Sequence, residues 1–119
     1  MVTKGNSQTN NEELLQMAIK TAKSGNKDSA RVMLRQVHQR DRSNETAMLW
    51  LAKVARTREE RESWLNRILE QNPDNETAKK ALEKMAYKQA ARDNRTIVMF
   101  GAVAAVMLII VLAIILILI

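Results

Sequence analysis

Residues 97–119 read IVMFGAVAAVMLIIVLAIILILI and contain no charged, amide or hydroxyl side chain. As an α-helix, this run is roughly 34 Å long, which is enough to cross a hydrocarbon core of about 30 Å. A buried core helix of this length would need a larger globule around it than the polar remainder of the chain can supply. The run therefore predicts a transmembrane helix, and it has neither the position nor the cleavage site of a signal peptide.

The sequence before the predicted span carries all of the charged side chains. There are 19 Lys and Arg against 13 Asp and Glu, a net charge of +6, and they lie between Lys4 and Arg95. The basic flank just before the span consists of Lys88, Arg92 and Arg95. Because basic residues beside a span stay on the cytoplasmic side, we expect a cytoplasmic N-terminal domain and a C-terminus at the far side. A span at the end of the chain further predicts a tail-anchored, single-pass membrane protein.

The sequence before the span has the period of α-helices and no strand-like alternation. Its apolar residues recur at intervals of three and four, which places them on one face of a helix. This pattern predicts five helices, near residues 11–24, 27–40, 44–56, 58–71 and from 74 onward. The polar residues before them, 1–10, are predicted to form a disordered lead.

The breaks between these helices have local chemical causes. Gly25 follows the first helix and can adopt positive φ without a steric penalty. Thr57 and Glu60 have the spacing of a capping box at the start of the fourth helix. Pro73 cannot continue a helix, and Asp74 is expected to cap the fifth.

The motif Asn-Glu-Thr-Ala occurs at residues 44–47 and again at residues 75–78, and each copy opens a predicted helix. Helix pairs that recur every roughly 30–40 residues are typical of α-solenoids. The alternative is a generic antiparallel helical bundle in which the motif is duplicated by chance.

Residues 11–90 resemble the tetratricopeptide repeat (TPR), a helical hairpin that recurs every ~34 residues. Residues 11–44 fit the repeat at full length, and residues 45–75 fit it with a shortened turn inside the repeat. The matching positions are Leu14, Met17, Ala18, Ala30, Leu34 and Val37 in the first repeat and Met48, Leu51, Ala52, Leu65, Ile68 and Pro73 in the second. Arg61 stands where the family has a small residue, and the family's usual tyrosine is missing.

The resemblance implies an all-α fold: a short TPR-like helical-hairpin array of two repeats plus a capping helix, followed by one C-terminal transmembrane helix. The expected segments are the lead (1–10), the TPR-like domain (11–92), a juxtamembrane basic flank (93–96) and the transmembrane helix (97–119). No Pro or Gly lies between Asp74 and Phe100, so the fifth helix either continues into the span or bends at a hinge near Asp93.

In TPR-like arrays, the first helix of each repeat lines a concave groove that binds extended peptides or partner helices. By resemblance, the partner groove of this chain is lined by Leu15, Ile19, Lys23, Leu49, Lys53, Arg56, Lys80 and Lys84. Most of these residues are basic, which favours an acidic segment of a protein partner. The alternative is an ordinary solvated helix face. The Lys/Asn set with which some members of the family hold a C-terminal carboxylate is not found, which argues against binding of chaperone tails.

Other residues concern packing and the membrane. Trp50 and Trp64 are predicted to pack on adjacent helices of the second repeat, with a place in the groove as the alternative for Trp50. The basic residues of the fifth helix favour attraction to anionic membrane lipid. Within the span, Gly101 and Ala105 form a small-xxx-small pair, which permits close packing with another transmembrane helix or a second copy.

The sequence shows no constellation of an enzyme. His38 is the only histidine and is interpreted as a solvated helix residue, and there is no phosphate-binding loop or metal-ligand spacing. We therefore expect no catalytic residue, no cofactor and no metal. Nucleic acid is not an expected partner either, because basic and acidic residues are interleaved and only 3% of residues are aromatic.

These features predict a non-enzymatic adaptor or scaffold, in which a TPR-like domain is tethered to the cytoplasmic face of a membrane and binds another protein. The alternative function is that of a small accessory subunit of a larger membrane complex, held mainly through its transmembrane helix.

Overall fold

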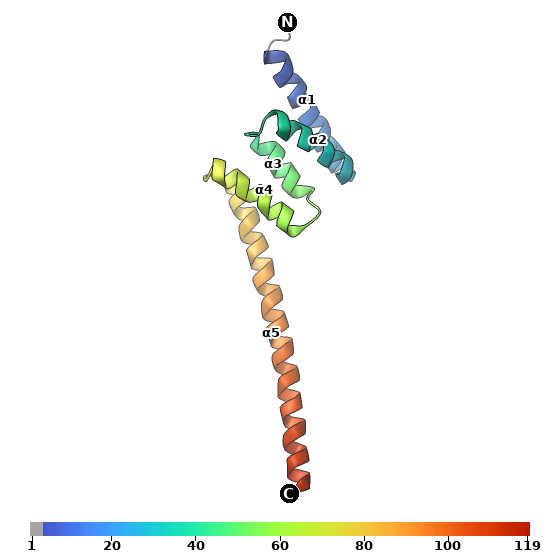
Figure 1. The fold of residues 1–119 in the computed structure, drawn as a ribbon, viewed down its shortest axis with the longest axis vertical. Helices are drawn as coiled ribbons and strands as arrows, with labels where there is room; N and C mark the ends of the chain where they lie inside the picture. Colours follow the sequence, from blue (N-terminus) through green and yellow to red (C-terminus); the bar gives the residue numbers. More distant parts are fainter. Residues whose placement is uncertain (1–3) are drawn as a thin grey trace. The chain divides into compact units, whose positions relative to one another are not determined.

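The structure, a computed structural model, describes residues 4–119 and is built from α-helices (Figure 1). The helices are α1 (Lys4–Lys23), α2 (Lys27–Arg40), α3 (Glu45–Lys53), α4 (Arg58–Gln71) and α5 (Glu76–Leu118). No strand occurs among the described residues, so the all-α class is confirmed for them. The bounds of α2 and α4 agree with the predicted ranges.

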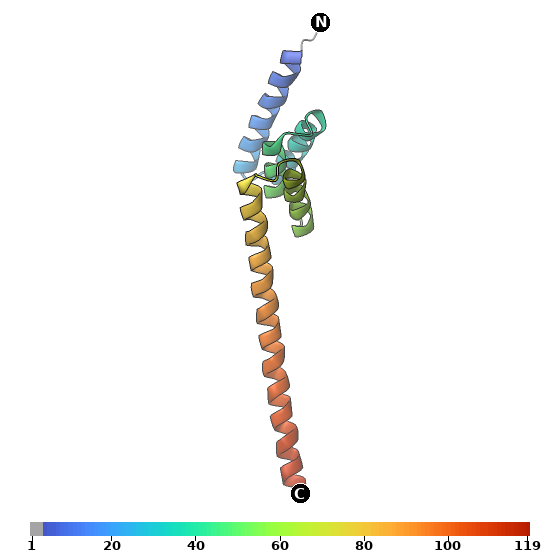
Figure 2. The same ribbon diagram turned by 90° about the vertical axis from the view of Figure 1, so that its left-hand side faces the viewer.

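The chain divides into two compact units, which are described separately (Figure 2). The first unit ends at Leu82, and the second comprises Glu83–Ile119. Residue 92, which ends the predicted TPR-like domain, lies in the second unit. Helix α5 has no break at Asp93, which answers the question of a hinge at that position.

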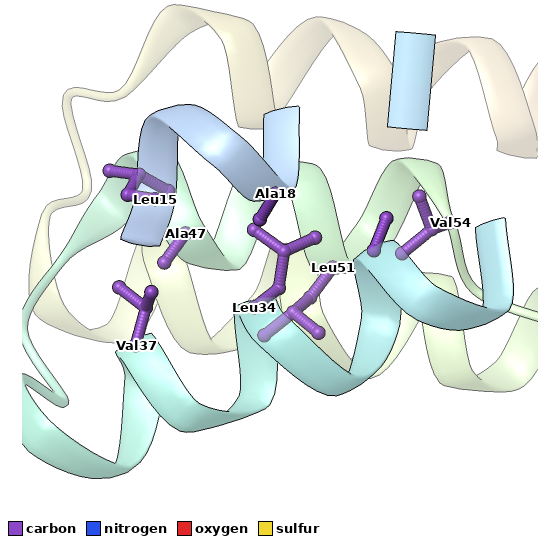
Figure 3. Packing of buried hydrophobic residues seen from close by; sticks show 8 residues of the cluster. Leu15, Ala18, Leu34, Val37, Ala47, Leu51 and Val54 are labelled. Atoms are coloured by element: carbon purple, nitrogen blue, oxygen red, sulfur yellow. The ribbon is translucent and has the colours of Figure 1, made fainter. Parts of the chain in front are cut away.

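The first unit contains two helical hairpins and the start of α5: α1 packs against α2, and α3 packs against α4. Contacts between α2 and α3 join the hairpins. The core at this junction contains buried side chains from three helices, namely Leu15, Ala18, Ala30, Leu34, Val37, Ala47, Leu51 and Val54 (Figure 3). The apolar stripe that each helix shows in the sequence is thus covered by its neighbours.

The two copies of the Asn-Glu-Thr-Ala motif have the same structure. Asn44 Oδ1 accepts a hydrogen bond from the backbone N–H of Ala47, and Asn75 Oδ1 accepts one from that of Ala78, each at 3.0 Å. Both alanines are 0% exposed. Each motif therefore combines an N-cap with a small residue at a buried contact. Asn75, and not the predicted Asp74, supplies the cap of α5.

The similarity extends into the turn before each motif. Asp41 and Asn72 have nearly the same backbone angles, φ −140° with ψ 93° and φ −140° with ψ 89°. Their N–H groups donate to the carbonyl oxygens of Val37 (2.9 Å) and Ile68 (2.7 Å), both of which are fully buried residues. The duplicated sequence thus marks a duplicated helix–turn–helix unit, because the same local hydrogen bonds end one helix and begin the next.

Helix α3 ends at Lys53, earlier than the predicted residue 56. The N–H of Val54 still bonds to the carbonyl oxygen of Trp50 at 3.0 Å, and the Val54 side chain is buried in the core. The carbonyl oxygen of Val54 accepts a hydrogen bond from Nη2 of Arg31. Helix α2 therefore supplies a partner for one of the carbonyl groups at the end of α3.

The N-terminal part of α1 differs from the prediction of a disordered lead. Residues 4–10 are helical, while residues 1–3 lie outside the described part of the chain. Asn11 is 8% exposed, and its Nδ2 donates to the carbonyl oxygen of Val37 on α2 at 3.4 Å. This hydrogen bond joins α1 to α2 at Asn11, and the polar composition of the segment does not predict it.

Candidate partner-binding site

Trp50, near the end of α3, is flanked by lysines from two helices. Nζ of Lys53, on the same helix, lies 4.2 Å from the centroid of the indole ring, and Nζ of Lys23, the last residue of α1, lies 5.9 Å from it. Both distances are in the range of a cation–π interaction. The last turns of α1 and α3 therefore meet at one aromatic ring, which is half-buried and packs against the core.

Neither lysine has a carboxylate partner within the described part of the chain. The ion pairs there are Arg31–Asp28, Arg35–Glu60, Arg56–Asp28 and Lys79–Glu76. Lys23 and Lys53 are exposed. Two uncompensated ammonium groups therefore stand beside an aromatic surface, an arrangement that can pair with a carboxylate while an apolar group packs on the indole.

A polar cleft of about 1210 Å³ lies along the same two helices, toward their N-terminal ends. Its lining comes from the first half of α1, the α2–α3 connection and the start of α3, and includes Gln8, Asn11, Asp41, Asn44 and Thr46. Since α1 and α3 share this cleft at their starts and meet at Trp50 near their ends, they run in the same direction along one face. We call the cleft together with Lys23, Trp50 and Lys53 the α1–α3 face.

The aliphatic residues predicted to line the groove contribute mainly to packing. Leu15 borders the cleft but is only 6% exposed and belongs to the core. Ile19 and Leu49 are half-buried, and Ile19 packs against the core. The spacing of these residues identifies a helix face, but the neighbouring helices decide how much of that face is covered.

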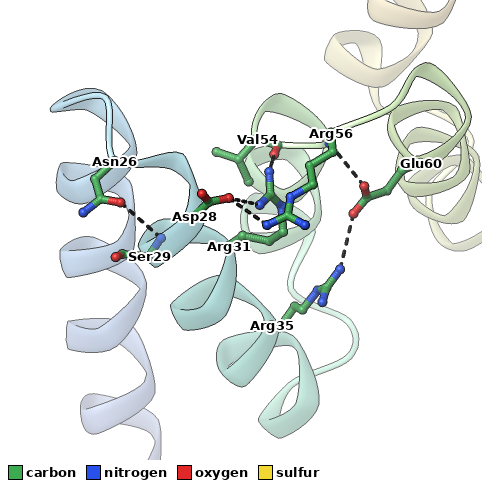
Figure 4. Close-up of polar contacts among 8 residues, drawn as sticks. All are labelled: Asn26, Asp28, Ser29, Arg31, Arg35, Val54, Arg56 and Glu60. Carbon is green, nitrogen blue, oxygen red and sulfur yellow. Dashed lines mark hydrogen bonds and ion pairs between the residues drawn. The ribbon is translucent and has the colours of Figure 1, made fainter.

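Arg56, in the α3–α4 connection, forms an exposed ion pair with Asp28 of α2 (Figure 4). Its Nη2 lies 2.9 Å from Oδ1 of Asp28, and Nη1 of the buried Arg31 lies 2.7 Å from the same oxygen. The hydrogen bonds from Arg56 and then from Arg31 lower the pKa of Asp28. The backbone N–H of Arg56 also donates to Glu60 Oε2 at 3.2 Å. Arg56 therefore links the α3–α4 connection to α2.

Two further predicted groove residues, Lys80 and Lys84, occupy exposed positions of α5. Lys80 belongs to the first unit and Lys84 to the second. Neither is among the cations at Trp50, which are Lys23 and Lys53. Of the eight predicted groove residues, Lys23 and Lys53 are thus the two that the structure brings together around an aromatic ring.

Trp50 and Trp64 both pack against the core, and Trp64 also contacts α2. Its ring meets that of His38 edge-on, with centroids 4.9 Å apart and an interplanar angle of 88°, and the Arg67 guanidinium carbon lies 4.9 Å from the Trp64 ring. His38 is half-buried and not simply solvated. Burial, followed by the charges of Arg67 and Arg42, lowers the pKa of His38. This ring contact joins α2 to α4, and no local sequence pattern predicts it.

The residues predicted to meet the membrane lie in the second unit. Lys88, Arg92 and Arg95 are exposed on α5, and Gly101 and Ala105 are exposed further along it. A Cβ added at Gly101 would meet no atom within 4 Å, so the small-residue pair has open space around it. Helix α5 is also the one described helix that is long and apolar enough to cross a membrane, with a mean hydropathy of 3.3 over its most apolar window.

Within residues 4–119, no group of three or more His, Asp or Glu side chains is placed to hold a metal ion. No protein-family model matches the chain, and neither a curated protein nor a solved structure matches it.

Proposed function

We propose that this protein is a membrane-tethered adaptor, whose helical unit binds an acidic segment of a partner protein on the α1–α3 face. The observation that carries the proposal is the convergence of Lys23 and Lys53 on Trp50 from two separate hairpins. A carboxylate placed between the ammonium groups would replace water around both charges, and an adjacent apolar side chain would cover the exposed part of the indole.

The architecture of the first unit supports this role. The two hairpins, joined through the duplicated turn, suit a short TPR-like array, in which the first helices of successive hairpins line the binding surface. The cleft and Trp50 lie at opposite ends of the α1–α3 face, so an extended segment could contact both. The amide and hydroxyl groups of the cleft would then bind the polar backbone of that segment.

The apolar part of α5 supports the tether. Its large side chains are exposed, for example Ile109 at 65% and Leu112 at 52%, and a hydrocarbon environment would cover them. Lys88, Arg92 and Arg95 precede this part, which favours a cytoplasmic location of the first unit.

The adaptor function is tested by crosslinking in native membranes followed by mass spectrometry of the captured proteins. The variant K23E/K53E reverses both charges at Trp50, while the control K20E/K27E makes the same change of net charge at exposed positions outside the α1–α3 face. We expect the first variant to lose its main crosslinked protein and the control to retain it. Equal capture by both variants would remove the α1–α3 face from consideration.

A third variant separates the adaptor from an accessory subunit of a membrane complex. In it, residues 97–119 are replaced by an unrelated apolar helix of the same length, which removes the Gly101–Ala105 pair. An adaptor retains its partner after this exchange, because the contact lies in the first unit. Loss of the partner here, together with its retention by K23E/K53E, would establish the accessory-subunit function instead.

A further inference from the structure

Four basic residues of the second unit form one stripe along α5, which we call the basic stripe: Lys84, Lys88, Arg92 and Arg95. With 3.6 residues per turn, these positions fall within about 80° of arc around the helix. All four side chains are exposed. The stripe is therefore a continuous positive surface on one side of the helix that leads to the apolar segment.

The acidic residues of this part of α5 do not neutralise the stripe. Glu83 and Asp93 lie about 100° or more from its edges around the helix. The Asp93 carboxylate instead accepts a hydrogen bond from Nε2 of Gln89 at 3.1 Å. In the described part of the chain, no ion pair involves a residue of the stripe. Its positive charge is thus available to a ligand.

The position of the stripe specifies the kind of ligand. At 1.5 Å per residue, Arg95 and Arg92 lie about 3 Å and 8 Å along the helix from Ile97, where the apolar segment begins. A headgroup layer is about 5–8 Å thick on each side of a bilayer, so both residues fall within it or at its edge. Lys88, about 14 Å away, lies within a further Debye length of about 8 Å, whereas Lys84, about 20 Å away, lies beyond it.

We propose that the basic stripe binds the phosphate-bearing headgroups of anionic lipids in the membrane into which α5 inserts. The inference rests on the proposed insertion of α5 and adds the lipid class that its flank recognises. Guanidinium groups form bidentate hydrogen bonds with phosphate oxygens, so Arg92 and Arg95 are the main contacts. Lys84 and Lys88 add positive charge farther from the apolar segment. The contribution of each basic residue to lipid binding therefore decreases with its distance from Ile97.

The test measures lipid binding to the full chain in a neutral detergent by native mass spectrometry, with phosphatidylserine and phosphatidylcholine as the probes. We expect the wild type to prefer phosphatidylserine by at least about five-fold, since one basic group near the headgroups contributes a factor of that size. The variant K84Q/K88Q/R92Q/R95Q should lose the preference. The control K20Q/K27Q/R40Q/R42Q, with the same change of charge in the first unit, should keep it.

Single substitutions and a competitor sharpen the test. Arg95→Gln and Arg92→Gln should each reduce the preference more than Lys84→Gln does. Free phosphoserine in excess should not displace the lipid, because the headgroup is held beside the stripe by the insertion of its acyl chains.

Several results would overturn the inference: no lipid preference in the wild type, an equal loss in the control variant, or displacement by free phosphoserine. Extraction of reconstituted vesicles with alkaline carbonate separates this failure from that of the tether. A wild type that resists extraction but shows no preference refutes the lipid inference alone, whereas a wild type that is extracted refutes the insertion of α5.

Discussion

The two units of this protein are both helical, but different surroundings stabilise their helices. In the first unit, most of the large apolar side chains are covered by neighbouring helices, and Leu34, Val37 and Ile68 are 0% exposed. In the second unit, every residue from Ala90 to Ile119 is exposed, including the most apolar part of the sequence. The first unit is a protein core assembled from short helices, while the second is a single helix whose apolar surface has no protein cover within its unit.

The two units differ in how their apolar residues are distributed around the helices, and this distribution makes α5 apolar enough to cross a membrane. Short isolated helices are marginal in water, so α3, with 9 residues, depends on its buried face. The C-terminal part of α5 is apolar around its whole circumference, which is the pattern of a helix in hydrocarbon. Four predictions follow this contrast, from the largest effect to the smallest.

Leu34→Ala should lower the free energy of unfolding of the first unit by about 2–5 kcal/mol, because it leaves a cavity where the two hairpins meet. Leu112→Ala, at a 52% exposed position of the second unit, should leave this stability unchanged. Urea unfolding in neutral detergent, followed by tryptophan fluorescence, measures the effect, since both tryptophans lie in the first unit. Equal unfolding midpoints for the two variants would contradict the proposed contrast.

Ile109→Arg should make the free energy of membrane insertion less favourable by about 2.5–3.5 kcal/mol, which is the cost of an arginine near the centre of a bilayer. Ala91→Arg places the same side chain at another exposed position of α5, before the apolar segment, and should leave insertion unchanged. The carbonate-resistant fraction of each variant is the measurement. If both variants insert equally, the apolar segment does not sit in the hydrocarbon layer.

Asn44→Ala and Asn75→Ala should each destabilise the first unit by about 1 kcal/mol, because each removes the cap of a helix. The exposed Asn66, within α4, provides the control, and its change to Ala should alter stability by less than about 0.5 kcal/mol. Urea midpoints again report the result. An effect at only one of the two caps would show that the duplicated turns are not energetically equivalent.

Acidification should destabilise the first unit through His38. Since burial lowers its pKa in the folded state, the unfolded chain binds the proton first as the pH falls below about 6.5. Stability is therefore greatest above this value and declines as the pH approaches the lower pKa of the folded state. The lowered pKa of Asp28 also makes the folded state less stable as the pH falls, but only below the ordinary pKa of 3.8. His38→Gln should flatten the dependence of the urea midpoint between pH 7.5 and pH 5.5; an unchanged slope would exclude His38 as its source.

The helix boundaries were largely predictable because local chemistry sets them. Gly25, with φ 96°, ends the first hairpin's leading helix, and Thr57 Oγ1 accepts a hydrogen bond from the N–H of Glu60, as its capping role requires. The cap of α5 was misassigned because Asp74 and Asn75 are both good N-cap residues, and only the hydrogen bond to Ala78 distinguishes them. The candidate site was less predictable, since it depends on how one helix meets another.

By itself, the sequence determined the all-α class, the duplicated turn and the apolar segment of α5, since these depend on neighbours within a few positions along the chain. Only the tertiary structure decided that Leu15 is core, that Arg56 pairs with Asp28, and that Lys23 joins Lys53 at Trp50. The physical reason is that helical periodicity specifies which residues share a face. What covers that face, and which charges are thereby paired or left open, depends on the packing of helices that are distant in sequence.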